Sequence, residues 1–131
     1  MIVKLNTGKW AALVGNGYNN SGSGHAVLYV IDIMTGALVK ALSTAAGTAA
    51  SPNGLSSPTP VDTNSDGRID LVYAGDIDGN MWKFDLRDAS IAAWTSTRLF
   101  AGSRSVVGAP DISGHPLGGF IVHFATGNLF T

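Results

Sequence analysis

The segment 62–70 carries the residue types that bind a divalent cation, at spacings that let them meet. Asp62, Asn64 and Asp66 stand at positions 1, 3 and 5 of this segment, and Asp70 stands at position 9. Calcium takes about six to eight oxygen ligands, and a loop that wraps around the ion turns alternate side chains inward. The spacing therefore predicts a calcium (Ca2+) site built from one contiguous loop.

A glycine in the middle of this segment supports the same interpretation. Gly67 occupies position 6, where glycine permits a sharp turn, and the turn brings the backbone carbonyl of Arg68 toward the ion. Three carboxylates in one short loop repel one another, and a bound cation offsets that repulsion. Magnesium suits the loop less well, because it requires a small octahedron and keeps several waters. The competing interpretation is a solvated turn rich in Asp and Asn that binds no metal.

The segment departs from the EF-hand pattern after its ninth residue. Position 12 is Tyr73 rather than Glu, and residues 71–74 are typical of a β-strand instead of a helix. The loop is therefore expected to join two strands. Its bidentate ligand would then be Asp70, or another nearby carboxylate such as that of Asp76.

The composition around this loop favours β-structure and excludes several classes of site. All nine acidic residues are Asp, Glu and Gln are absent, and there are 17 Gly, so strand and turn formers replace helix formers. With 131 residues, of which 45% are hydrophobic, the chain can form one domain with a real core. The formal net charge of -1 argues against nucleic acid as a partner. The absence of Cys excludes disulfides, thiolate metal sites and cysteine nucleophiles.

The apolar segments are short throughout the chain. The longest, 26–31, ends at Asp32 and is far shorter than the roughly 20 residues that cross a bilayer, so no membrane span is expected. The first residues lack a basic segment followed by a long apolar one, so no secretion signal is visible. If the protein is exported, the sequence is expected to be a piece of a longer chain.

Short apolar runs bounded by Gly, Asn and Asp predict an all-β fold. Thr35-Gly36 and Asp78-Gly79 predict tight hairpin turns, and the composition of 43–57 predicts a long surface loop. The three tryptophans are expected in the core or in the packing between blades; they are Trp10, Trp82 and Trp94. The predicted strands are 10–14, 26–33, 37–42, 69–74, 80–86, 98–101 and 120–125, with short strand-like segments at 60–62 and 110–111 before the second and third repeats.

One pattern recurs along the chain: an apolar strand that ends in Gly and a polar residue, followed by a strand that ends in Asp. Its glycines, Gly15, Gly75 and Gly127, are 60 and 52 residues apart, which leaves room for about four strands per unit, as in a propeller blade. We therefore expect a partial β-propeller of about two to three four-stranded antiparallel blades, one domain over 1–131, with blades near 1–43, 57–102 and 103–131. A single twisted β-sandwich is the alternative.

Several of these segments together resemble a known family. Residues 62–70, followed by Tyr73-Ala74-Gly75-Asp76 and Trp82-Lys83-Phe84-Asp85, and preceded by Gly15-Asn16-Gly17-Tyr18, resemble the C-terminal β-propeller of the type IV pilus biogenesis factors called PilY or PilC. The resemblance covers nearly the whole chain. It implies a domain of a longer exported protein with more blades and a large N-terminal region, which acts with pili in assembly, retraction control and adhesion. It also implies that calcium binds the propeller loop, here at Asp62, Asn64, Asp66, the Arg68 carbonyl and Asp70.

The leading hypothesis is a calcium-binding module of a pilus-associated protein at the outer membrane, on the pilus or at the cell surface. The ion would order the loop and so control a partner-binding state. Expected partners are pilus components or a host or surface ligand, and the isolated chain is expected to form homo-oligomers. No enzyme is expected, because no activated nucleophile or cofactor cradle is visible. The alternatives are a fragment of a quinoprotein dehydrogenase, which would hold a quinone, and an integrin-type calcium-stabilised repeat.

Overall fold

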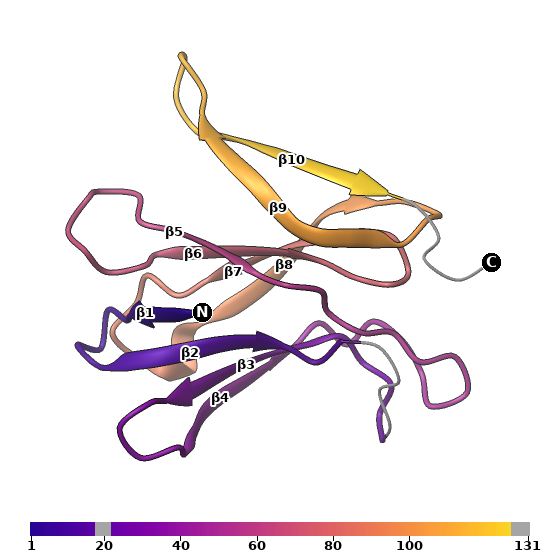
Figure 1. Ribbon diagram of the computed structural model, residues 1–131, viewed down its shortest axis with the longest axis horizontal. Coiled ribbons are helices and arrows are strands. Elements are labelled where there is room, and N and C mark those ends of the chain that lie inside the picture. The colour runs from indigo at the N-terminus through magenta and orange to yellow at the C-terminus, as the bar shows by residue number, and fades with distance from the viewer. Residues whose placement is uncertain (18–21, 127–131) are drawn as a thin grey trace.

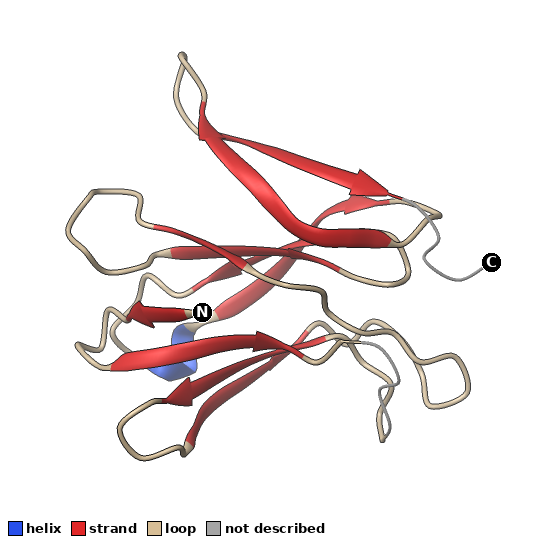
Figure 2. Cartoon of the chain, in the orientation of Figure 1, coloured by secondary structure: helices blue, strands red, loops and turns tan. Residues whose placement is uncertain are grey.

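Strands make up nearly all of the regular structure of this protein. The computed structural model describes residues 1–17 and 22–126 (Figure 1). The single helical element in these residues is one short 3-10 turn, η1 (Ile91–Ala93), as Figure 2 shows. No helix among the described residues is long and apolar enough to cross a membrane. The prediction of an all-β fold is confirmed.

The strands form three antiparallel sheets that lie above one another in Figure 1. Within each sheet the strands pair in chain order, so each sheet is a simple meander, the topology of a propeller blade. The first sheet contains β1 (Ile2–Lys4), β2 (Trp10–Gly15), β3 (Val27–Asp32) and β4 (Leu38–Ser43). The second contains β5 (Thr59–Val61), β6 (Leu71–Gly75), β7 (Asn80–Asp85) and β8 (Thr95–Ala101). The third is the hairpin of β9 (Val106–Gly114) and β10 (Phe120–Thr126).

The strand predictions are right for the long apolar runs and for the short segment 60–62, which overlaps β5, and they are incomplete elsewhere. The three-residue strand β1 was not predicted, because three residues are too few to show alternation. Only 110–111 was predicted within β9, since Gly108 and Pro110 interrupt its apolar pattern. The strand β8 begins at Thr95, three residues before the predicted start. The expected third repeat at Gly127 and the family residue Tyr18 lie outside the described residues.

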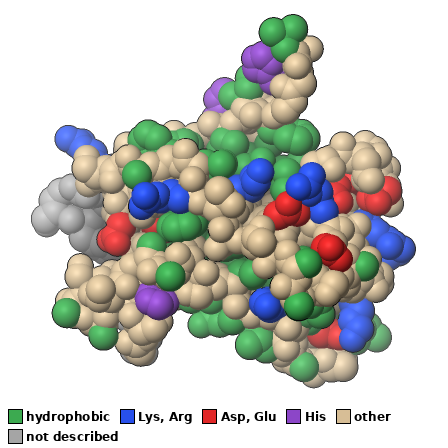
Figure 3. All heavy atoms as spheres, turned by 180° about the vertical axis from the view of Figure 1, so that it is seen from behind, with side chains coloured by type: hydrophobic (Ala, Val, Ile, Leu, Met, Phe, Trp, Pro, Cys, Tyr) green, Lys and Arg blue, Asp and Glu red, His purple; other side chains and the backbone are tan. Residues whose placement is uncertain are grey.

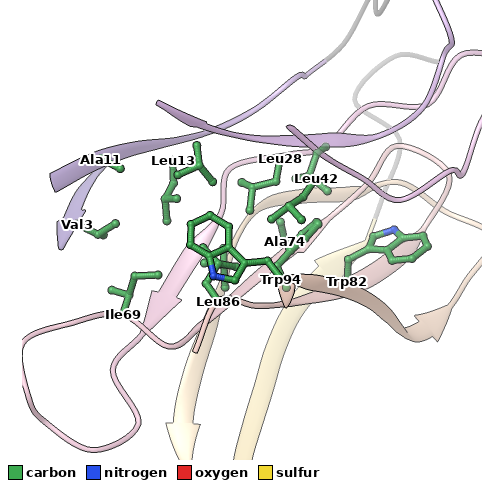
Figure 4. Packing of buried hydrophobic residues seen from close by; sticks show 14 of the residues in the cluster. Val3, Ala11, Leu13, Leu28, Leu42, Ile69, Ala74, Trp82, Leu86 and Trp94 are labelled. Carbon is green, nitrogen blue, oxygen red and sulfur yellow. The ribbon is translucent and has the colours of Figure 1, made fainter. Parts of the chain in front are cut away.

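The main core lies between the first and second sheets. Figure 4 shows Leu13, Leu28 and Leu42 of the first sheet facing Trp94 and Leu86 of the second unit, by which we mean the second sheet with the segments that connect its strands. Because residues alternate along a strand, Val72 and Ala74 of β6 point toward this core, while Leu71 and Tyr73 point to a second cluster with Val106 of β9. All five residues of β6 are therefore buried, and the second sheet is the middle layer.

Two of the three tryptophans lie in the core. Trp82 and Trp94 are 7% and 5% exposed, whereas Trp10 is 49% exposed on the outer face of the first sheet. The segment 43–57 also differs from a plain surface loop, because Asn53 and Leu55 are buried. The Leu55 N–H donates to Oδ1 of Asn16, which follows β2, and Leu55 pairs with Asp76, which follows β6. The end of this connection therefore joins two sheets.

Candidate metal centre

The loop 62–70 connects β5 to β6 and projects from the left side of the second sheet in Figure 1. The Asp70 N–H donates to the Val61 carbonyl at 2.9 Å, so the two ends of the loop are held together. One carboxylate oxygen each from Asp62, Asp66 and Asp70 lies within 4.8 Å of the other two. Acidic side chains are visible at the corresponding right margin of the space-filling view (Figure 3). The fold thus brings together the three carboxylates that the spacing picked out.

The carboxylate of Asp62 organises the backbone of the loop. Its Oδ2 accepts the Gly67 N–H at 2.8 Å, and its Oδ1 accepts the N–H groups of Asn64 and Asp66 at 3.3 Å. Ser65 and Gly67 have φ of 59° and 84°, and these left-handed residues curl the chain around the carboxylate. Desolvation acts to raise the pKa of Asp62, but donation from these backbone N–H groups outweighs it and lowers the pKa, so the carboxylate is ionised.

The side-chain amide of Asn64 lies between the carboxylates of Asp62 and Asp66. With the Asn64 amide in one orientation, its Oδ1 lies 2.9 Å from Asp62 Oδ1 and 3.0 Å from Asp66 Oδ1. With the amide turned over, its nitrogen donates to both carboxylates instead. Asp66 Oδ1 also accepts the N–H of Arg68, which follows Gly67 in the turn. The first orientation presents three oxygens to a cation, and the second satisfies them without one.

Asp70 is the anchored member of the group. It is 4% exposed, and its Oδ2 accepts both the N–H and the hydroxyl of Thr63 at 2.8 Å. Its Oδ1 accepts the Asn6 side-chain amide at 3.1 Å. A carboxylate oxygen has more than one lone pair, so each can still contact a cation. The hydrogen bonds fix the direction in which this carboxylate points.

Asp76 does not belong to this group, so the prediction that it could replace Asp70 as a ligand is wrong. It follows the opposite end of β6, is fully buried, and lies in another network. Its Oδ2 accepts Asn53 Nδ2, Asn80 Nδ2 and Trp82 Nε1 at 2.8, 2.9 and 2.7 Å, and its Oδ1 accepts the Asn80 N–H at 2.7 Å. Four hydrogen-bond donors thus satisfy this buried carboxylate.

The donor set fits a hard divalent cation of calcium type. It contains three carboxylates and one amide oxygen, and no nitrogen or sulfur donor. Asp66 and Asn64 are exposed, so an ion can reach the loop, while Asp70 provides a fixed base. Tyr73, which stands where an EF-hand has Glu, is buried in β6 and 5% exposed. Further ligands would therefore come from backbone carbonyls and water.

Two supporting residues were missed by the sequence interpretation. Thr63 lies inside the motif, and its hydroxyl at position 2 was a readable signal for a bond within the loop. Asn6 is 64 residues away from Asp70, and no local spacing relates the two.

Comparison with known proteins gives one consistent result. A family model described as the PilY1 beta-propeller domain matches residues 1–131. The type IV pilus biogenesis factor PilY1 of Pseudomonas aeruginosa is 36% identical, in an alignment that covers 98% of this chain and 13% of that protein. A PilY1 homolog of Xylella fastidiosa is 32% identical, over 98% of this chain and 10% of its own length. The crystal structure of the P. aeruginosa PilY1 C-terminal domain matches with a TM-score of 0.87 and 34% identity, over 100% of this chain and 32% of that one.

Proposed function

This chain belongs to the PilY1 β-propeller domain family, and on that premise we propose that it is a calcium-binding module of a type IV pilus protein. The proposed ligands are Asp62, Asn64, Asp66, the Arg68 carbonyl and Asp70. The observation that carries the proposal is the convergence of three carboxylates within 4.8 Å on one strand-connecting loop.

The proposed ligands would have different roles in binding the ion. Asp70 is held by Thr63 and Asn6 and acts as a fixed ligand. Asp62 binds the ion while its backbone hydrogen bonds keep the loop curled. Asn64 presents its oxygen in one amide orientation, and its nitrogen satisfies the carboxylates in the other. When bound, calcium neutralises the clustered charges and so favours the ordered loop.

The relatives suggest the biological setting of this module. They are named type IV pilus biogenesis factors, and the chain spans only 13% and 10% of the lengths of the two that are compared above. We propose that the domain is exported and pilus-associated, that it has no enzymatic activity, and that calcium regulates its part in pilus assembly, retraction or attachment. Its partners would be pilus components or a surface ligand. A quinoprotein fragment is the weaker alternative, because all proposed ligands come from one contiguous loop rather than from a central channel.

A calorimetric titration tests the calcium proposal. We expect one Ca2+ to bind per chain, with a Kd between about a micromolar and a millimolar, and Mg2+ to bind more weakly. At 100 times the Kd, calcium should add about 2.7 kcal/mol to the free energy of unfolding. Heat signals that are equal for Ca2+, Mg2+ and buffer alone would refute the proposal.

The outer face of the first sheet provides the basis for a proposal about assembly. Exposed apolar side chains there include Ile2, Trp10 and Val14, which are 63%, 49% and 43% exposed. The corresponding positions of the second sheet are covered by the first sheet. The strand pairing shows the correspondence: the pair Ile2 and Ala12 matches the pair Pro60 and Val72, and the pair Val14 and Tyr29 matches the pair Ala74 and Trp82. The face is thus shaped to receive another blade, and blade repeats near 1–43, 57–102 and 103–131 are the proposed units.

We expect the isolated chain to self-associate by covering this face with a second copy. Water-exposed apolar surface of this extent favours association. Light scattering after size-exclusion chromatography should give a multiple of the chain mass, and Trp10→Lys together with Val14→Lys should return it to one chain. A single-chain mass for the unmodified protein across a dilution series would contradict the expectation.

A further inference from the structure

The side-chain amide of Asn6 joins the first sheet to the candidate metal centre. Asn6 lies in the turn between β1 and β2, and its Nδ2 contacts three acceptors of the second unit. These are the Ile69 carbonyl at 2.9 Å, Asp70 Oδ1 at 3.1 Å and the Leu86 carbonyl at 3.2 Å. One amide group therefore touches the end of the metal loop and the end of β7 together.

Backbone hydrogen bonds reinforce this junction on both sides. The Ile69 N–H donates to the Lys4 carbonyl of β1 at 2.9 Å. The Leu86 N–H donates to the Asp70 carbonyl at 2.9 Å. Within the first sheet, the turn that carries Asn6 is closed by the Leu5 N–H, which donates to the Lys9 carbonyl at 2.8 Å. These backbone hydrogen bonds thus fix the position of Asn6 independently of its contact with Asp70.

Asn6 is the inter-sheet partner of the Asp70 carboxylate. The other side-chain hydrogen bonds to Asp70 in the described residues come from Thr63, which lies in the metal loop itself. Asp70 is 4% exposed, so water has little access to replace the amide. A hydrogen bond to a metal-ligating carboxylate holds it in the orientation that the ion needs.

We infer that Asn6 is a positioning residue for the cation site and that it couples occupancy of that site to the packing of the first sheet against the second. The inference rests on the calcium binding proposed above. Coupling is reciprocal. If the inter-sheet contact strengthens ion binding by a given free energy, the bound ion stabilises the inter-sheet contact by the same free energy. A cation on an exposed loop would in this way stabilise the junction between two blades.

The first test compares calcium affinities of two matched variants. Asn6→Ala should raise the calorimetric Kd for Ca2+ about 10-fold, as the loss of a hydrogen bond to a ligand does. Asn16→Ala is the control: Asn16 directly follows β2 of the first sheet, is partly buried and accepts the Leu55 N–H of the 43–57 connection, but it has no hydrogen bond to Asp70. Its Kd should stay within about twofold of that of the unmodified protein.

The second test needs no substitution and so remains valid if Asn6→Ala does not fold. Hydrogen exchange of the Leu5 and Gly8 amides, both bonded within the first-sheet turn, is measured with and without Ca2+. Calcium should slow their exchange by about 10-fold at saturation, by the same coupling, although neither residue is a proposed ligand. In Asn6→Ala, if folded, this protection should be lost even when Ca2+ is raised to saturation.

The outcomes separate this inference from the proposal beneath it. If the unmodified protein binds no Ca2+, the calcium proposal fails and the inference fails with it. If it binds Ca2+ but its first-sheet amides exchange at the same rate with and without the ion, the coupling is wrong and the calcium site stands. A Kd for Asn6→Ala equal to that of Asn16→Ala would overturn the positioning role.

Discussion

Replacement of Asp66 by alanine should weaken calcium binding by about 100-fold or more, because it removes one of three clustered carboxylates. The remaining ligands then carry less charge, and the oxygen of Asn64 loses its neighbour on one side. Because Asp66 is exposed, the free energy of unfolding without calcium should change by no more than about 0.5 kcal/mol. Calorimetry and denaturant unfolding measure the two effects separately.

Asp88→Ala is a closely matched control for this experiment. Asp66 Oδ1 accepts the Arg68 N–H at 2.9 Å, and Asp88 Oδ1 accepts the Ser90 N–H at 2.7 Å, so both are exposed carboxylates that stabilise a turn two residues ahead. Asp88 lies outside the loop, and its replacement should leave the calcium Kd unchanged. Equal affinities for the two variants would mean that the carboxylate cluster does not bind the ion.

Replacement of Asp76 by alanine should destabilise the fold by about 3 kcal/mol or more. The substitution removes the buried acceptor of the Asn80 and Trp82 side-chain donors, and one of the acceptors of Asn53 Nδ2. These donors come from the 43–57 connection and from β7, so the lost hydrogen bonds weaken the contact between that connection and the second sheet. In chemical unfolding the midpoint should fall strongly, while calcium affinity, measured below the transition, should stay the same.

Two further variants show whether the buried carboxylate itself matters. Asp111→Ala, at an exposed position of β9, should change stability by less than about 0.5 kcal/mol. Asp76→Asn keeps the shape and can keep the oxygen that receives three donors, but its amide nitrogen then faces the Asn80 N–H. It should therefore fall between Asp76→Ala and the unmodified protein. Stability of Asp76→Ala equal to that of Asp111→Ala would show that the network contributes nothing.

The metal loop was readable from the sequence because all of its acidic groups lie within nine consecutive residues. Asp62, Asp66 and Asp70 are spaced four residues apart with Gly67 between the last two, and local backbone geometry suffices to bring them together. Ser65 shows the limit of this reading. Its positive φ of 59° helps the loop curl, but serine carries no sequence signal for that conformation.

The repeat was also readable, since Gly15 and Gly75 close corresponding strands. Each is placed where another segment approaches: a Cβ on Gly75 would lie 2.2 Å from Val106 Cγ1, and one on Gly15 would lie 2.4 Å from the Ser56 carbonyl oxygen. The strands next to these glycines were predicted because their apolar runs are long. The strand β1 was missed because it is short, and β9 was predicted only in part because its apolar pattern is interrupted; pairing with neighbouring strands decides the structure of both.

The polar residues that connect the sheets were beyond the reach of sequence patterns. Asn6 and Asn53 bond to carboxylates 64 and 23 residues away. Asparagine is common in turns, so neither residue stands out from its neighbours. Asp76 was assigned to the wrong group because it is close to Asp70 in the sequence. The strand β6 separates the two residues, so they lie at its opposite ends.

A crystal structure of the chain grown in Ca2+, with anomalous diffraction data, tests the central claim most directly. We expect one anomalous peak within the loop, with oxygen ligands from Asp62, Asn64, Asp66, Asp70 and the Arg68 carbonyl at about 2.3–2.6 Å. The Asn64 amide should then point its oxygen toward the peak. Water alone at that position, with the Asn64 nitrogen donating to both carboxylates at saturating calcium, would contradict the account.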